Sequence, residues 1–195
     1  MYELIILSLL SRATFHGYLI AKIINDVVGP YTKISNGRLY PLLAKLEHDG
    51  LINFAEEPSV EQTKTRPVQS YQITEQGRQR FYQLMMDVSS NPGDYQRIFN
   101  YKTAMFDMIP FSDRIKLIDH YTNYCYNQIY HIKTEKADME ANAEIRMTQA
   151  PVDRIIEMMA HRLQQWELEH EWALHLREVE LARHGEGQPD PHPTK

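Results

Sequence analysis

The sequence predicts a mainly α-helical fold with one small β-hairpin, followed by a second and wholly helical region. Apolar stripes with helical spacing extend over most of the 195 residues. Residues that favour strands gather in two short runs, 51–54 and 68–73. The densest cluster of helix-breaking residues, at 89–93, separates the two regions. With 43% hydrophobic and 24% charged residues, the chain can form packed cores and is not expected to be disordered as a whole.

Three short helices are expected first along the chain. The first is the mostly apolar run 4–10. The second begins near Gly17 and is stopped by Gly29. The third follows Ser35, whose hydroxyl can accept hydrogen bonds from backbone N–H groups of the first helical turn. It carries an inward stripe of leucines and ends at Gly50.

The two strand-forming runs are expected to pair as an antiparallel hairpin. The polar segment between them, 58–67, is too long for a two-residue turn and contains Lys64 and Arg66. We therefore expect a projecting loop with a basic tip. After the hairpin, Thr74 is expected to cap a fourth helix that runs to about Val88.

Beyond the breaker cluster, only helices are expected. They are predicted over 95–108, 112–148 and 151–184. These patterns divide the chain into four parts: residues 1–88, a linker at 89–94, a helical region at 95–184 and a disordered tail at 185–195.

The last helix has an apolar stripe with three- and four-residue steps over about 30 residues. At about 1.5 Å per residue it extends roughly 45 Å, which is more than one small domain needs to cover its core. The pattern therefore predicts a partner helix. The residues assigned to this contact are Val152, Ile155, Ile156, Met159, Leu163, Trp166 and Leu174.

Helix, helix, capped helix and a basic-tipped hairpin is the order of a winged helix-turn-helix, in which the third helix enters the DNA major groove. Arg and Asn can make bidentate contacts with bases, whereas Tyr, Ser and Lys typically contact phosphates. The alternative is that these polar residues only face water, as on any short amphipathic helix. On and before the third helix, the candidates for DNA contact are Lys33, Ser35, Asn36, Arg38, Tyr40 and Lys45.

Four segments of residues 1–88 together form a recognisable signature: HGYLI at 16–20, LYPLLAKLE at 39–47, GLI at 50–52 and YQITEQGR at 71–78. Together they resemble the signature of the PadR family of transcriptional regulators. The helical remainder is similar in layout to the virulence-activator-alpha-type C-terminal domain of longer PadR proteins, which dimerises through its long helices.

The resemblance implies a homodimeric repressor that binds a pseudo-palindromic operator in double-stranded DNA. It implies that 1–88 is the DNA-binding domain, with Tyr18 near a phosphate and Lys64 and Arg66 in the wing. Asn36 and Arg38 are the expected base-reading residues. Since family namesakes control phenolic-acid detoxification, it also implies a small aromatic effector that acts on the helical domain and releases the DNA, although no residue is assigned to its site.

Other functions stay open at this point. One is a winged-helix regulator of another type, such as a MarR-like protein, or an activator. Another is a helical sensor or interaction dimer that does not bind DNA. No motif predicts an enzyme or a cofactor, and His170 and His175 are too far apart in helical register to bind one metal ion as an i, i+4 pair.

The single cysteine, Cys125, cannot form an intramolecular disulfide and is expected to be an inert buried thiol. No apolar run reaches the roughly 20 residues that span a bilayer, and the start lacks the features of a signal peptide. We therefore expect a cytoplasmic protein that does not contact a membrane.

The net charge of −5 argues against a uniformly basic nucleic-acid coat, but the charge is unevenly distributed. Residues 1–88 hold nine of the 21 basic and nine of the 26 acidic residues, so the whole acidic excess lies in 89–195. The neutral first region is compatible with DNA binding that is modest in strength and sensitive to salt.

Overall fold

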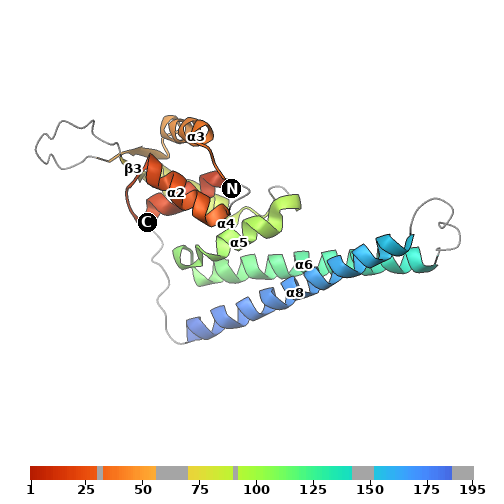
Figure 1. The fold of residues 1–195 in the computed structure, drawn as a ribbon. Helices are drawn as coiled ribbons and strands as arrows, with labels where there is room; N and C mark the ends of the chain where they lie inside the picture. The colour runs from red at the N-terminus through yellow and green to blue at the C-terminus, as the bar shows by residue number, and fades with distance from the viewer. Residues whose placement is uncertain (30–32, 56–69, 90–91, 142–151, 186–195) are drawn as a thin grey trace, which may run out of the picture. The chain divides into compact units, whose positions relative to one another are not determined.

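The computed structural model describes residues 1–29, 33–55, 70–89, 92–141 and 152–185 (Figure 1). The fold is mainly α-helical with a small antiparallel sheet, as predicted. It divides into two compact units, Met1–Met105 and Phe106–Lys195, which we call the head and the arm. The compact head ends at Met105 and not at the predicted linker 89–94. The functional domain bounds predicted from the sequence stay predictions. Lys64, Arg66 and the predicted tail from 186 onward lie outside the described residues.

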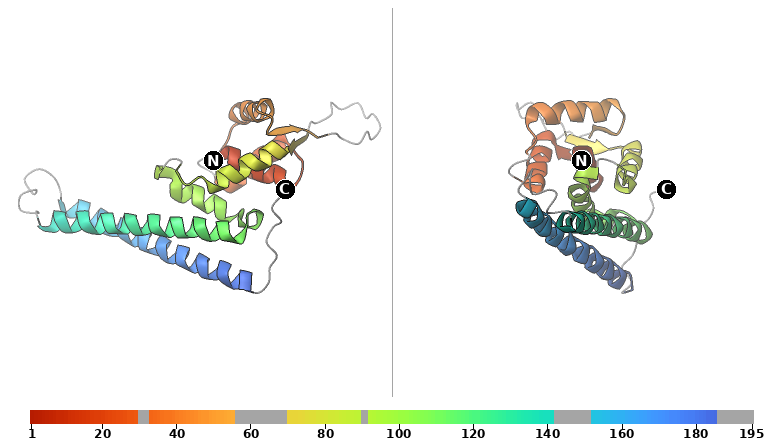
Figure 2. Two further views of the ribbon diagram at one scale, coloured as in Figure 1. Left: turned by 180° about the vertical axis from the view of Figure 1, so that it is seen from behind. Right: turned by 90° about the vertical axis from the view of Figure 1, so that its right-hand side faces the viewer.

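The head contains five α-helices among its described residues, and Figure 2 shows them around the sheet. Their bounds are α1 (Tyr2–Arg12), α2 (Gly17–Val28), α3 (Asn36–His48), α4 (Glu75–Met86) and α5 (Tyr95–Thr103). The apolar stripes predicted from the sequence form the core. Its members include Leu4, Ile5, Leu7, Ile20, Ile24, Leu39, Leu43, Leu46, Phe81 and Met85.

The sheet has the order β1-β3-β2, with all neighbours antiparallel. Its strands are β1 (Phe15–His16), β2 (Ile52–Phe54) and β3 (Ser70–Ile73). The prediction of only two strands was wrong. It missed β1 because two residues are too few to show the alternation by which a strand is recognised. In the register of the sheet, His16 lies opposite Ser70, and Phe54 lies opposite Tyr71.

Thr74 caps α4, as predicted, and joins the helix to the hairpin. Its hydroxyl oxygen accepts a hydrogen bond from the Gly77 N–H at 3.0 Å and donates to the Gly50 carbonyl at 2.7 Å. A Cβ atom on Gly77 would lie 2.0 Å from the Leu51 carbonyl oxygen, so only glycine fits there. The cap and this close approach place the start of β2 against the first turn of α4.

The arm contains a 3-10 turn, η2 (Phe106–Met108), and two long helices, α6 (Phe111–Ala141) and α8 (Val152–Gly185). The two helices lie side by side and run antiparallel (Figures 1 and 2). The predicted helix over 95–108 is interrupted, because α5 ends at Thr103 and η2 follows. In the described part of the chain, none of the helices is both long and apolar enough to span a membrane.

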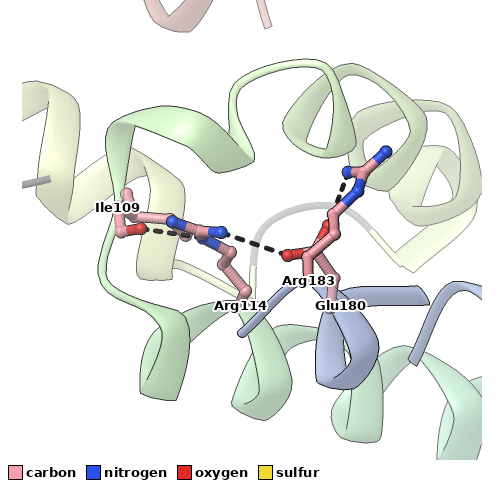
Figure 3. Close-up of polar contacts among 4 residues, drawn as sticks. All are labelled: Ile109, Arg114, Glu180 and Arg183. Atoms are coloured by element: carbon pink, nitrogen blue, oxygen red, sulfur yellow. Dashed lines mark hydrogen bonds and ion pairs between the residues drawn. The ribbon is translucent and has the colours of Figure 1, made fainter. Parts of the chain in front are cut away.

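Polar side chains join α6 to α8 beside a narrow apolar contact. Arg114 donates one hydrogen bond to the Ile109 carbonyl at 2.9 Å and another to the Glu180 carboxylate at 3.1 Å, and Arg183 donates to the other Glu180 oxygen at 3.2 Å (Figure 3). The Tyr121 hydroxyl donates to Glu169 at 2.6 Å. Polar contacts between side chains thus join the two helices of the arm beside their apolar contact.

Cys125 is buried in this α6–α8 contact. Burial raises the pKa of its thiol to about 12, so the reactive thiolate form is scarce at neutral pH. The expectation of an inert buried cysteine is therefore consistent with its surroundings.

Candidate nucleic-acid interface

Helix α3 has one buried and one exposed face. The buried face consists of Leu39, Leu43 and Leu46, which fix the helix on the core of the head. Residues three and four positions apart share a helix face, which identifies the opposite, exposed face as Gly37, Pro41, Ala44 and His48. Three of these four side chains are small, so the backbone of α3 can come close to a surface that it meets.

Longer side chains line the two edges of that exposed face. Arg38 and Lys45 lie along one edge, and Asn36 and Tyr40 lie along the other. All four are exposed. The arrangement places the predicted base-reading and phosphate-contacting groups on both sides of a strip of mostly small side chains.

Arg38 has an intramolecular neighbour that the sequence did not indicate. Its guanidinium carbon lies 5.9 Å from the ring centroid of Tyr2 in α1, within the range of a cation–π contact. This contact restricts where the guanidinium can lie, although the side chain stays exposed. The two residues are far apart in the sequence, and no local pattern predicts their pairing.

Tyr40 extends from α3 to the first residue of α2. A Cβ atom on Gly17 would lie 3.0 Å from Tyr40 Cε1 and 3.3 Å from its hydroxyl oxygen, so glycine leaves the space that the ring fills. The next residue, Tyr18, is 75% exposed. The structure therefore gathers Tyr18 and the Tyr40 hydroxyl near the start of α2.

The N-termini of α2 and α3 lack side-chain caps. Ser35 is the N-cap residue of α3, as predicted, but the prediction that its hydroxyl caps the helix was wrong. The Ser35 backbone carbonyl instead accepts the N–H groups of Arg38 and Leu39, at 3.0 and 2.9 Å. His16 likewise makes no side-chain cap for α2. A helix N-terminus without a side-chain cap suits an anion such as a DNA phosphate, because the helix dipole is positive at this end.

An aromatic pair joins the two strands of the hairpin. The Phe54 and Tyr71 rings face each other across β2 and β3, with centroids 5.1 Å apart. Burial raises the pKa of Tyr71, and the charges of Glu47 and Tyr40 raise it further. The Tyr71 hydroxyl is therefore protonated at neutral pH and can donate a hydrogen bond. Neither aromatic residue was predicted as part of the site.

The predicted DNA-contacting residues that the structure describes all have exposed side chains. Lys33 is exposed just before α3, two residues before the N-cap Ser35. The predicted residues that lie on α2 and α3 are all exposed: Tyr18, Asn36, Arg38, Tyr40 and Lys45. The wing residues Lys64 and Arg66 lie outside the described part of the chain. The contribution of each residue to DNA binding stays a prediction.

The stripe predicted for the partner helix is used partly within the chain. Trp166 meets Tyr124 of α6 edge to face, at 5.6 Å between ring centroids, and Val152 is buried. Ile155, Ile156, Met159 and Leu163 are half-buried, and Leu174 is exposed. Helix α6 is thus one partner of α8, while part of the stripe stays accessible.

Among the described residues, no cluster of His, Cys, Asp or Glu could hold a metal ion.

The elements of the head define a class of protein. Three helices, a two-stranded hairpin and a following helix, with a short strand completing the sheet, form a winged helix-turn-helix. Residues 6–83 match the model of the Transcriptional regulator PadR-like family. The head therefore contains a PadR-like domain over these residues, which confirms the resemblance seen in residues 1–88.

Solved structures to which the chain is similar include the following three. Bacillus subtilis PadR in complex with operator DNA has 18% identity and a TM-score of 0.39, with 91% of this chain and 96% of that chain covered. Streptococcus mutans smu.1604c has 25% identity and a TM-score of 0.36, with 92% and 98% covered. The Vibrio cholerae virulence activator AphA has 18% identity and a TM-score of 0.35, with 93% and 99% covered. A comparison with curated protein sequences finds no match.

Proposed function

We propose that the chain is a PadR-type transcriptional repressor that binds a pseudo-palindromic operator as a homodimer. The observation that supports this most directly is the exposed face of α3, made mostly of small residues, within a PadR-like domain. Small residues let that face approach DNA, and Arg38 and Asn36 flank it with side chains suited to guanine and adenine edges.

Contacts with the DNA backbone would come from around this face. Lys33 and Lys45 are exposed near the two ends of α3, and Tyr18 is exposed at the start of α2. With the uncapped N-termini of α2 and α3, these groups form a surface suited to phosphates. Such contacts position the protein on DNA without selecting a sequence.

Dimerisation would use the flank of α8 that α6 leaves accessible. Ile156, Leu163, Leu174 and Leu181 follow one another at seven- and eleven-residue steps and so share that flank. They are half-buried or exposed within one chain. A second copy that covers this flank would give two recognition helices related by a two-fold axis, for half-sites about one DNA turn apart.

We further propose that a small aromatic compound, such as a phenolic acid, releases the DNA. The support is the family resemblance, and the mechanism follows from the proposed dimer. Both half-sites must be engaged at once, so a ligand that favours a different spacing or tilt of the two heads lowers operator affinity. The probe is p-coumaric acid, and the expected result is weaker operator binding while the dimer persists in sedimentation.

The central experiment measures binding to a duplex that carries an inverted repeat from the promoter region. Groove binding with several phosphate contacts should make log affinity fall steeply with log salt concentration. Arg38→Ala should cost about 1–3 kcal/mol on this duplex and relax discrimination at one base position. Lys45→Ala should weaken binding to all duplexes alike and reduce the salt slope by about 1. Arg154→Ala in the arm is the matched control and should change nothing. DNA binding that is absent or independent of salt would overturn the proposal in favour of a helical sensor.

A further inference from the structure

Asn25, in the last turn of α2, makes two hydrogen bonds to the backbone of one residue nine positions later. Its side-chain oxygen accepts the Ile34 N–H at 2.7 Å. Its side-chain nitrogen donates to the Ile34 carbonyl at 3.3 Å. The amide therefore satisfies both backbone groups of Ile34, as a neighbouring strand would do.

Ile34 occupies the point where the chain enters α3. Its side chain is buried in the core of the head, and the next residue, Ser35, is the N-cap of α3. Because the Ser35 hydroxyl does not cap the helix, the side chain of Ser35 does not hold the first turn in place. The backbone just before α3 is held instead from α2, through Asn25.

Helix α2 gives this contact a rigid base. Ile24, the residue before Asn25, and Ile20, one turn earlier, are completely buried. At the other end of α3, Leu46 is buried, and its carbonyl accepts the Leu51 N–H at 2.9 Å. Both ends of α3 are thus attached to the head, and Asn25 holds the backbone at the end that carries Asn36 and Arg38.

We propose that Asn25 is a positioning residue for DNA recognition, which sets the path of the chain into α3 and so the placement of Asn36 and Arg38 against base edges. This inference rests on the proposed function. Bidentate base contacts need accurate placement, whereas flexible lysines can follow a phosphate over a wider range. Loss of the Asn25 contact therefore weakens sequence-specific binding more than non-specific binding.

The amide is the group that fits these two bonds. An aspartate in its place keeps an acceptor for the Ile34 N–H but brings a second oxygen against the Ile34 carbonyl. An alanine removes both bonds. Asp26, the next residue, is exposed on the same helical turn and serves as the matched control.

The experiment compares the full-length wild type with Asn25→Ala, Asn25→Asp and Asp26→Ala at one salt concentration. Dissociation constants are measured for the operator duplex and for a scrambled duplex of equal length. Asn25→Ala should lose about tenfold or more in operator affinity and change less than about twofold on the scrambled duplex. Asn25→Asp should lose at least as much on the operator, while its added negative charge also weakens binding to the scrambled duplex. Asp26→Ala should match the wild type. A purely structural role predicts an equal loss on both duplexes, so equal loss, or no loss, would overturn the proposal.

Amide hydrogen exchange of the free protein provides a test that does not depend on DNA. In Asn25→Ala the Ile34 amide should exchange at least about tenfold faster, while Leu43, within α3, keeps its wild-type rate. If the wild type does not prefer the operator over the scrambled duplex, the proposed function fails. The Ile34 exchange rate then decides on the positioning role alone, and an unchanged rate would refute it.

Discussion

The head and the arm use their polar side chains differently. In the head, several polar side chains bind backbone groups: Asn25 holds Ile34, Thr74 holds Gly50, and Lys102 donates to the Asp87 carbonyl at 2.6 Å. In the arm, charged and polar side chains on α6 bind partners on α8, such as Arg114 with Glu180 and Asp119 with Arg177. The first kind of contact fixes the path of the chain, whereas the second fixes how two regular helices lie against each other.

The difference follows from the shapes of the two units. The head surrounds its apolar core with helices and a sheet, so its irregular connections must have their backbone groups satisfied. Two helices enclose only a narrow apolar strip, so the edges of the α6–α8 contact depend on ion pairs. A unit built like the head suits the exact placement of a recognition helix. A unit built like the arm has a stability that depends on individual charge pairs.

The largest effect is expected at the buried ion pair of the arm. The Glu180 and Arg114 side chains are only 3% and 13% exposed, and Glu180 binds Arg183 as well (Figure 3). Glu180→Ala removes the carboxylate that compensates the desolvated guanidinium. It should lower the free energy of unfolding of the arm by about 3–5 kcal/mol.

Tryptophan fluorescence measures this effect in the arm alone, because both tryptophans of the chain, Trp166 and Trp172, lie in α8. Urea titrations of the full chain give the midpoint for each variant. Glu178→Ala, an exposed glutamate on the same helix, is the control and should shift the midpoint little. A Glu180→Ala midpoint equal to that of the control would show that the buried pair does not hold the arm together.

The next effect concerns the head and depends on pH. Lys102 is almost fully buried, and this burial lowers its pKa from 10.5 to about 8, partly offset by the charge of Asp87. Between about pH 8 and 10.5 the unfolded chain binds a proton that the folded head does not. The stability of the head should therefore rise with pH over this window, by about 3 kcal/mol in total.

Lys102→Met should remove this rise, because methionine does not titrate and fills a similar volume. The measurement is thermal unfolding by circular dichroism from pH 7 to 10, with the tryptophan signal used to subtract the arm. Lys22→Met, an exposed lysine of the head, is the control and should keep the wild-type slope. A slope that persists in Lys102→Met would assign it to another group.

Local patterns in the sequence predicted the parts of the structure that depend on neighbours along the chain. The leucine stripe of α3 and the Thr74 cap follow from spacing within one helical turn. The contact of Asn25 with Ile34 spans nine residues, and no pattern within one helical turn predicts it.

Contacts between helices, in the candidate site and in the arm, could not be predicted because they depend on tertiary packing. Arg38 meets Tyr2 only because α1 and α3 are folded into one head. Likewise, the pairing of Arg114 with Glu180 depends on the register of α6 against α8, which no single-helix pattern specifies. The sequence therefore indicated which residues are exposed on α3 but not which neighbours hold them.

The smallest effect is expected at the exposed ion pair of the arm, which joins the same two helices as the buried one. Asp119 and Arg177 lie 2.8 Å apart, but their side chains are 48% and 40% exposed. Water and salt screen such a pair, so Asp119→Ala should cost no more than about 1 kcal/mol. Sodium chloride at about 0.5 M should abolish most of this effect. A double-mutant cycle with Arg177→Ala, followed by tryptophan fluorescence, isolates the coupling. A coupling as large as the Glu180 effect, and insensitive to salt, would mean that burial is not what distinguishes the two pairs. The length of the α6–α8 contact, and not one buried site, would then determine the stability of the arm.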